Sequence, residues 1–125
     1  TETSFAMDFD RLRQDIKGMN DYFMKAQITG LTMSTQLGIE MLSHFRLSLR
    51  YLMLGGSKMH HIPAGATKVI NGYGPTEFTV CSSYYILEQD EKHDNIPIGR
   101  PVPNSISVVV DREGRLVPQG TVGEL

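Results

Sequence analysis

The amino-acid sequence predicts an α/β protein, with a partly parallel sheet and flanking helices followed by antiparallel β strands. Helical and extended segments alternate from residue 15 to residue 82, a pattern typical of parallel strands joined by crossover helices. From residue 83 to residue 125, short β-branched runs alternate with polar turns, which favours antiparallel pairing. We therefore expect one domain-sized unit over residues 1–125, with an α/β part at 15–82 and a mainly β part at 83–125.

Two amphipathic helices are expected in the α/β part. In the first, apolar residues recur at helical spacing beside charged ones. They are Ile16, Met19, Tyr22, Phe23 and Ala26. Residues 28–33 are expected to form a short strand, and the second helix is expected to begin near Thr35. Its apolar face consists of Leu37, Met41, Leu42 and Phe45.

Two further strands are expected to lie side by side in the sheet. Residues 50–54 form a nearly continuous apolar run, as expected for a strand buried on both faces. A loop rich in Gly, Pro and His covers residues 55–65, and another strand is expected at 68–70. Because strands of the α/β part are separated by helical segments long enough for a crossover, which is normally right-handed, we expect them to run parallel, with 50–54 central.

The C-terminal third has a different pattern. Residues 82–87 alternate loosely and predict a strand, and residues 88–95 form a polar, charged loop. A β-branched run at 105–110 leads into the turn Asp-Arg-Glu-Gly at 111–114 and then into residues 115–117. Two extended runs joined by such a turn predict a hairpin.

The segment from Asn71 to Glu77, with the sequence Asn-Gly-Tyr-Gly-Pro-Thr-Glu, follows an apolar strand and carries chemically useful groups. Its glycines let the backbone approach a ligand, and Tyr73 offers a flat face for stacking on a base. Pro75 can open a helix at its first turn. A hydroxyl from Thr76 and the carboxylate of Glu77 suit a nucleotide phosphate and its Mg²⁺. The same segment is also compatible with a plain strand–turn–helix joint.

Five blocks of the sequence resemble the adenylate-forming (AMP-binding) superfamily, in the form found in amino-acid adenylation domains of nonribosomal peptide synthetases. In family order, the blocks are residues 35–38, 49–56, 71–77, 96–104 and 114–125. The resemblance implies a reaction in two steps. A carboxylate attacks the α-phosphate of ATP, held with Mg²⁺, and the acyl group of the resulting adenylate passes to the phosphopantetheine thiol of a peptidyl-carrier domain.

The resemblance also implies roles for individual residues. Tyr73 would stack near adenine, Thr76 would contact phosphate, and Glu77 would hold Mg²⁺, which makes the last two the expected catalytic residues. The expected nucleotide-binding set is Gly55, Gly56, Asn71, Gly72, Tyr73, Gly74 and Thr76. The expected pocket for the substrate side chain is Thr35, Met53, Gly55, Gly72, Val80 and Cys81. Ser57 stands where the family usually has glutamate, a departure that bears on that position alone.

The family's full unit is several times longer than this chain. Nothing in the 125 residues resembles its Ser/Thr/Gly-rich phosphate loop, its ribose-binding aspartate or its catalytic lysine. We therefore expect a single partial domain that is inactive on its own, because catalysis collapses when such groups are removed together. The alternatives are a fragment of another adenylate-forming ligase, such as a D-alanyl carrier-protein ligase or an acyl-CoA synthetase, and a stand-alone nucleotide-binding module. The blocks at 35–38 and 96–101 favour the peptide-synthetase form.

Composition limits the other classes of function. The net charge is −2 and no basic block occurs, which argues against a nucleic-acid surface. The single cysteine, Cys81, fits a reducing compartment, so we expect a cytoplasmic protein. No apolar run reaches the ~18 residues of a membrane span. The histidines and Cys81 lack the spacing of metal ligands, and the run at 55–58 lacks the glycine spacing of a P-loop.

Overall fold

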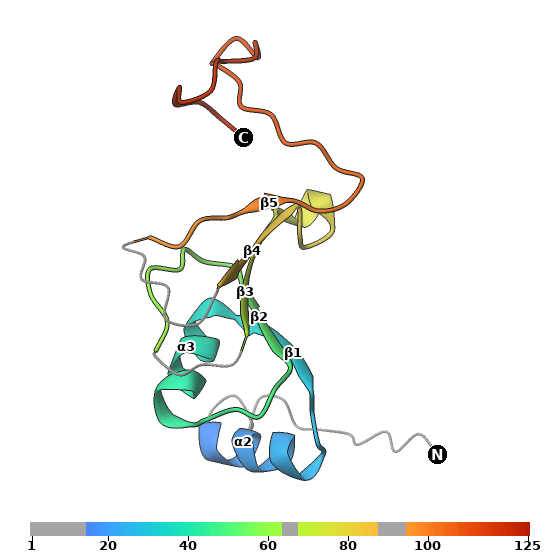
Figure 1. Ribbon diagram of the computed structural model, residues 1–125, viewed down its shortest axis with the longest axis vertical. Helices are drawn as coiled ribbons and strands as arrows, with labels where there is room; N and C mark the ends of the chain where they lie inside the picture. Colours follow the sequence, from blue (N-terminus) through green and yellow to red (C-terminus); the bar gives the residue numbers. More distant parts are fainter. Residues whose placement is uncertain (1–14, 64–67, 88–94) are drawn as a thin grey trace.

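The computed structural model describes residues 15–63, 68–87 and 95–125. Within these residues, one five-stranded sheet has the strand order β1-β2-β3-β4-β5 (Figure 1). The elements in chain order are α2 (Ile16–Lys25), β1 (Gly30–Ser34), α3 (Thr35–His44), β2 (Tyr51–Gly55), β3 (Val69–Tyr73), the 3₁₀ helix η1 (Thr76–Phe78), β4 (Ser83–Leu87) and β5 (Arg100–Pro101).

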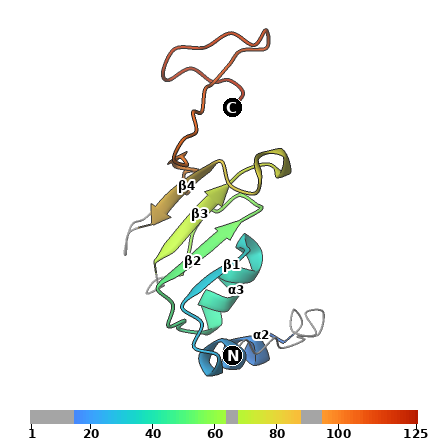
Figure 2. The same ribbon diagram turned by 90° about the vertical axis from the view of Figure 1, so that its right-hand side faces the viewer.

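The sheet is parallel at one side and antiparallel at the other. β1 pairs with β2 and β2 with β3 in parallel, whereas β3–β4 and β4–β5 are antiparallel. The predicted fold class is therefore confirmed. β2 lies between two parallel neighbours, and β3 occupies the middle of the order, where the parallel part meets the antiparallel part. Figure 2 shows β1 to β4 side by side with α3 against one face.

Both predicted helices are present, and each is bounded by side-chain or backbone hydrogen bonds. The carboxylate of Asp15 accepts a hydrogen bond from the Gly18 N–H at 2.8 Å and caps α2. At the other end, Gln27 has a φ of 52° and the Ile28 N–H reaches back to the Phe23 carbonyl at 3.0 Å. Because this C-cap uses Ile28, the following strand begins at Gly30 and not at residue 28 as expected.

Helix α3 covers the face of the parallel strands that carries Leu52 and Leu54. It packs against β1 and β2, and it ends at His44 because Phe45 is extended, with a φ of −132°. Gly38 lets the helix approach the sheet so closely that a Cβ there would overlap the Leu54 side chain. Among the described residues, no helix is long and apolar enough to cross a bilayer.

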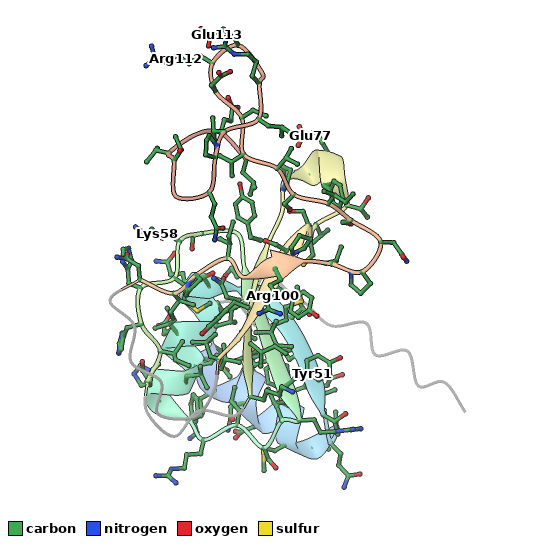
Figure 3. All side chains as sticks on the ribbon, turned by 45° about the horizontal axis from the view of Figure 1, so that its top comes forward. Tyr51, Lys58, Glu77, Arg100, Arg112 and Glu113 are labelled. Carbon is green, nitrogen blue, oxygen red and sulfur yellow. The ribbon has the colours of Figure 1, made fainter. Side chains whose placement is uncertain are left out.

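The core lies on one face of the sheet. Its buried cluster consists of Leu52, Leu54, Met59, Val69, Leu87 and Ile96. β2 was expected to be buried on both faces, and this expectation is wrong for the described residues. Leu52 and Leu54 are fully buried, but Tyr51 is 46% exposed and Met53 is half-buried, since α3 covers only the face that carries the leucines. Figure 3 labels Tyr51 on this open face.

The C-terminal segment extends away from the sheet (Figure 1). The expected hairpin is reduced to isolated antiparallel bridges from Val110 to Leu116 and to Glu124, and residues 105–109 form no strand. An exposed run without a neighbouring layer gains little from burial, so β-branched composition alone does not make a strand there. Parts of the expected loops at 55–65 and 88–95 lie outside the described residues.

The turn at 111–115 is held by one carboxylate. Asp111 accepts hydrogen bonds from the backbone N–H groups of Glu113 at 3.0 Å and Arg115 at 2.9 Å, and from the Arg115 Nε at 2.8 Å. The Arg115 backbone N–H is the main reason that the pKa of Asp111 lies below its ordinary value of 3.8. Arg115 also pairs with Glu113 at 2.9 Å.

We predict that the Asp111 carboxyl titrates below 3.8 in the folded chain, as followed by NMR. Because the folded pKa is lower than the unfolded one, the stabilisation by this carboxylate is present above the unfolded pKa. It is lost as the pH falls through the folded pKa. A titration midpoint at or above the ordinary value would show that the turn does not hold the carboxylate.

We also predict that Leu54→Ala lowers the free energy of unfolding by about 2–5 kcal/mol, because it opens a cavity beneath α3. The matched control is Leu116→Ala, since Leu116 is 72% exposed and should change stability by less than about 0.5 kcal/mol. Urea unfolding measures both. Equal losses in the two variants would mean that α3 does not pack on Leu54 as described.

Candidate functional site

The strand that carries the motif extends further than expected. β3 includes Asn71, Gly72 and Tyr73, so the expected end of this strand at Ile70 is wrong. β2 pairs with β3 as far as Gly72 on one side, and β4 pairs with it as far as Tyr73 on the other. Pairing on both edges supplies the hydrogen bonds that keep a glycine-containing segment extended.

Side chains alternate along β3, and its register with β2 shows which of them share a face. Gly72 lies beside Gly55 and shares its face with Met53. A Cβ at Gly72 would overlap the Met53 side chain, which confirms that the two positions face the same way. Asn71 and Tyr73 occupy the alternate positions and therefore belong to the opposite face.

The amide of Asn71 is engaged within the protein. Asn71 is 5% exposed, and its Nδ2 donates a hydrogen bond to the carbonyl oxygen of Pro97 at 2.7 Å. The neighbouring Ile96 N–H donates to the Met59 carbonyl at 3.1 Å. Together these bonds fasten residues 96–97 to the end of the motif strand and to the loop after β2.

Beyond β3, the chain forms a closed loop that returns to β4. The carbonyl oxygen of Tyr73 accepts hydrogen bonds from the Ser82 N–H at 2.8 Å and from the Ser82 hydroxyl at 3.1 Å. Gly74 lies directly against this return segment, because a Cβ there would be 2.6 Å from the Ser82 nitrogen and 2.8 Å from Cys81 Cα. The loop therefore closes only with glycine at this position.

The hydroxyl and the carboxylate of the motif lie in the 3₁₀ helix η1. Thr76 and Glu77 are its first two residues, and both are exposed. Pro75 was expected at the first helical position, but it is the N-cap, with φ −74° and ψ 164°, and its carbonyl accepts from the Phe78 N–H at 3.1 Å. Figure 3 shows Glu77 projecting from η1, away from the sheet.

Backbone strain is concentrated just after η1. Thr79 has a φ of 50° and Val80 a φ of 76°, which is unfavourable for β-branched residues. Positions of this kind cost on the order of 1–3 kcal/mol each and tend to cluster at functional sites. Val80 is 73% exposed, whereas Cys81 is half-buried and donates from Sγ to the Ser83 carbonyl at 3.3 Å.

The double glycine forms a turn at the end of β2. Gly55 is the last residue of the strand, and Gly56 has a φ of 89°. Thr35, at the start of α3, is 2% exposed and lies beneath this turn. Its hydroxyl is 3.1 Å from the Gly55 carbonyl oxygen and 3.2 Å from the Ser57 carbonyl oxygen.

The structure brings several of the expected pocket residues together. Met53, Gly55 and Gly72 share one face at the carboxyl ends of β2 and β3. Val80 and Cys81 belong to the loop that returns from η1 to β4. The Thr35 hydroxyl, by contrast, is directed to two backbone carbonyls of the glycine turn.

Two residues beside the candidate site, one on each face of the sheet, were not recognised from the sequence. Thr32 of β1 pairs with Met53 in the sheet register and is exposed, so it extends the face of Met53 and Gly72. The alternation of residues 31–33 could have indicated it. Ser83, beside Tyr73 in the register, is 3% exposed, and its hydroxyl has no hydrogen-bond partner among the described residues. Serine is a polar residue, so the sequence did not indicate that Ser83 would be buried.

The metal-ligating side chains near the motif suit a metal ion that is also bound by a substrate, and not a site in which the protein supplies all the ligands. Within the part of the chain that the structure describes, no three His, Cys, Asp or Glu side chains gather at one place. Glu77 offers one exposed carboxylate beside the Thr76 hydroxyl. Mg²⁺ is commonly held by one or two carboxylates together with substrate phosphates, so these residues fit Mg²⁺ bound to a nucleotide.

Comparison with known protein families identifies the chain. The sequence pattern of the family described as AMP-binding enzyme matches residues 4–125. The chain belongs to the AMP-binding enzyme family. The five sequence blocks that resemble this family all lie within the matched range.

Similar curated proteins are large synthetases. The chain is 34% identical over 113 residues to bacitracin synthase 1 of Bacillus licheniformis and 31% identical over 116 residues to surfactin synthase subunit 2 of Bacillus subtilis. These matches cover 90% and 93% of this chain but only 2% and 3% of the relatives. A shorter match, 55% identical over 58 residues, joins it to the nonribosomal peptide synthetase TES of Alternaria alternata. The chain thus spans a small fraction of the curated relatives it matches.

A solved structure has the same fold. The N-terminal subdomain of Klebsiella oxytoca NpsA, in complex with 3-hydroxybenzoyl-AMSN, superposes with a TM-score of 0.71 at 22% sequence identity. The match covers 88% of this chain and 30% of that chain. It supports the mixed sheet with its two helices as a piece of the AMP-binding fold.

We predict that Gly74→Ala opens the loop between β3 and β4, because the new Cβ cannot fit against the backbone at Cys81 and Ser82. The amide of Ser82 should exchange its hydrogen faster as its bond to Tyr73 breaks. Ser82→Ala is the matched comparison, since it removes the hydroxyl bond to Tyr73 and keeps the backbone bond. Hydrogen exchange read by NMR measures both, and unchanged protection in Gly74→Ala would contradict the close approach.

Proposed function

We propose that this chain is part of an amino-acid adenylation domain of a nonribosomal peptide synthetase. The reaction would join the carboxylate of an amino acid to the α-phosphate of ATP, release pyrophosphate, and transfer the acyl group to a carrier-domain thiol. The observation that carries the proposal is the motif from Asn71 to Glu77 at the carboxyl end of β3, beside the glycine turn of β2. Ligands of open α/β sheets bind at this edge of the sheet.

Strand alternation supports separate places for the two substrates. Tyr73 belongs to one face of β3, and the residue is 44% exposed, which leaves it accessible for stacking on adenine. Gly72 belongs to the other face together with Met53 and Gly55, and the flexible Met53 side chain, which lies over Gly72, would move aside for the acyl group. The α-phosphate would then lie over the end of β3, between the two faces. This arrangement allows a carboxylate and a phosphate to meet without a protein nucleophile, by positioning alone.

The proposed roles of the pocket residues follow from their place in the fold. Val80 and Cys81 would close the acyl pocket from the side of β4, and Thr32 would extend it along β1. Gly56 and Gly74 would let the backbone approach the nucleotide from the ends of β2 and β3. These side chains are small or weakly polar, so the pocket suits a modest substrate side chain.

Thr76 and Glu77 would act on the charged end of ATP. An exposed hydroxyl can donate to a phosphate oxygen, and an exposed carboxylate can hold Mg²⁺ that is also bound by phosphates. Mg²⁺ would supply positive charge to the phosphates during attack. The engaged amide of Asn71 would act differently, by keeping residues 96–97 beside the motif strand.

The remaining parts of the proposal concern the larger protein. We place residues 1–125 as one partial domain of the adenylation unit, with the α/β part at 15–82 and the mainly β part at 83–125. The partners would be the amino acid, ATP and a peptidyl-carrier domain with its phosphopantetheine arm, and the compartment would be the cytoplasm. Similarity to bacitracin and surfactin synthases supports the carrier-dependent form.

The test is pyrophosphate exchange by the protein that carries this chain in its natural length. Exchange dependent on one or a few amino acids is expected. The panel should include 3-hydroxybenzoate and free coenzyme A, because exchange with an aryl acid, or acyl transfer to coenzyme A, would assign the chain to a different adenylate-forming ligase. No exchange with any acid would contradict the proposal.

Glu77→Gln should lower the rate of exchange by a factor of about 10²–10³, a loss typical of removing one charge-stabilising group from an active site. Its stability should change by less than about 0.5 kcal/mol, because Glu77 is exposed. Exchange kinetics across a series of Mg²⁺ concentrations, together with thermal unfolding, measures both effects. The control is Glu113→Gln, which changes an exposed carboxylate in the turn at 111–115. An exchange rate equal to that of the unchanged protein would remove Glu77 from the site.

A further inference from the structure

The hydroxyl of Thr35 is placed to hold the glycine turn at the end of β2. The carbonyl oxygens of Gly55 and Ser57, which flank Gly56, both face Thr35 Oγ1, at 3.1 Å and 3.2 Å. A threonine hydroxyl has one proton to donate, so the two carbonyls share it. Thr35 is 2% exposed, and water therefore has little access to replace this donor.

Among the described residues, no atom packs against the outer side of this turn. A Cβ at Gly56 would meet none of their atoms within 4 Å. Two carbonyl oxygens that converge repel each other unless a donor lies between them, and a buried acceptor without a donor is costly. Together with the pairing of Gly55 and Gly72, the Thr35 hydroxyl therefore sets the position of the turn.

A shift of this turn would reach the motif strand directly. Gly55 pairs with Gly72 in the sheet register, and a Cβ at Gly55 would be only 2.8 Å from the Gly72 carbonyl oxygen. There is no space between the two strand ends to absorb a movement. Gly72 is followed at once by Tyr73, the residue proposed to stack on adenine.

We infer that Thr35 is a positioning residue for the adenylation reaction. Its hydroxyl sets the turn at 55–57 against Gly72, and Thr35 touches neither the acid nor the nucleotide. This inference rests on the proposed function and replaces the expectation that Thr35 lines the substrate pocket. Its side chain acts through the backbone of the turn, which borders both the acyl face and the adenine face.

The first experiment measures the turn itself by hydrogen–deuterium exchange in the protein of natural length. Thr35→Val keeps the shape of the side chain and removes the hydroxyl, so exchange should rise by roughly fivefold or more in peptides that cover 55–57 and 72–74. Thr35→Ser keeps the hydroxyl and should remain within about twofold of the unchanged protein. The matched control is Ser43→Ala, which removes another hydroxyl of α3, near the end of the helix opposite to Thr35. The Ser43 hydroxyl donates a hydrogen bond to the Ile39 carbonyl oxygen at 2.8 Å.

The second experiment separates positioning from stability and from direct contact. Thr35→Val should raise the KM for both the acid and ATP by roughly fivefold, and Thr35→Ser should restore both values. A purely structural role would reduce the amount of active protein and leave both KM values unchanged. If Thr35 instead lined the substrate pocket, Thr35→Val would change the KM for the acid alone, by an amount that depends on the size of the acid. Hydrogen–deuterium exchange at the turn would then be unchanged.

The outcomes also distinguish this inference from the proposed function. Failure of the unchanged protein to activate any acid would contradict the proposed function. The hydrogen–deuterium exchange experiment would still decide whether Thr35 holds the turn. Activity with unchanged deuterium exchange and unchanged KM values in Thr35→Val would overturn the inference and leave the proposed function intact.

Discussion

The contact between the ends of β2 and β3 is the constraint on which the candidate site depends. Gly55 and Gly72 are neighbours in a parallel register, and the space between them has no room for a Cβ at Gly55. This close approach brings the turn after β2 and the motif after β3 to the same edge of the sheet. Any side chain at Gly55 would push the two strand ends apart and separate the groups that the site must hold together.

The loop beyond β3 shows how a strained segment is kept in place. Thr79 and Val80 each adopt a backbone conformation that costs on the order of 1–3 kcal/mol. Two hydrogen bonds from Ser82 to the Tyr73 carbonyl close the loop, but each contributes a net of only about 0.5–1.5 kcal/mol. At the middle of these ranges, the two hydrogen bonds offset about half of the strain. The antiparallel pairing of β4 with β3 must supply the remainder, which ties the loop's shape to the integrity of the sheet.

The sequence was sufficient to predict that β2 and β3 run parallel, because the segment between them is long enough for a crossover. It was not sufficient for the length of β3. Glycine at position 72 reads as a strand breaker, and only pairing with β2 and β4 on both sides keeps it extended. The burial of β2 was overestimated for a similar reason, since an apolar run does not reveal which layers of the protein are present to cover it.

The residues expected at the candidate site could be named from the sequence, whereas the hydrogen bonds that they make could not. The motif residues from Asn71 to Glu77 do gather at the carboxyl end of β3, as a strand followed by glycines suggests. Nothing in the sequence indicates that the Asn71 amide binds the Pro97 carbonyl or that the Thr35 hydroxyl faces two carbonyls. Hydrogen bonds between residues far apart in the chain depend on the fold, so a local pattern cannot predict them.

Strand alternation places neighbouring residues of the candidate site on opposite faces of the sheet, which their order in the sequence does not show directly. Gly72 and Tyr73 are adjacent in the chain, yet they belong to opposite faces of β3. A ligand that contacts both must therefore pass over the end of the strand, with one portion on each side. The turn at 55–57 lies beside this crossing point through the pairing of Gly55 with Gly72. The proposed effect of the Thr35 hydroxyl on both substrates follows from its place behind this turn.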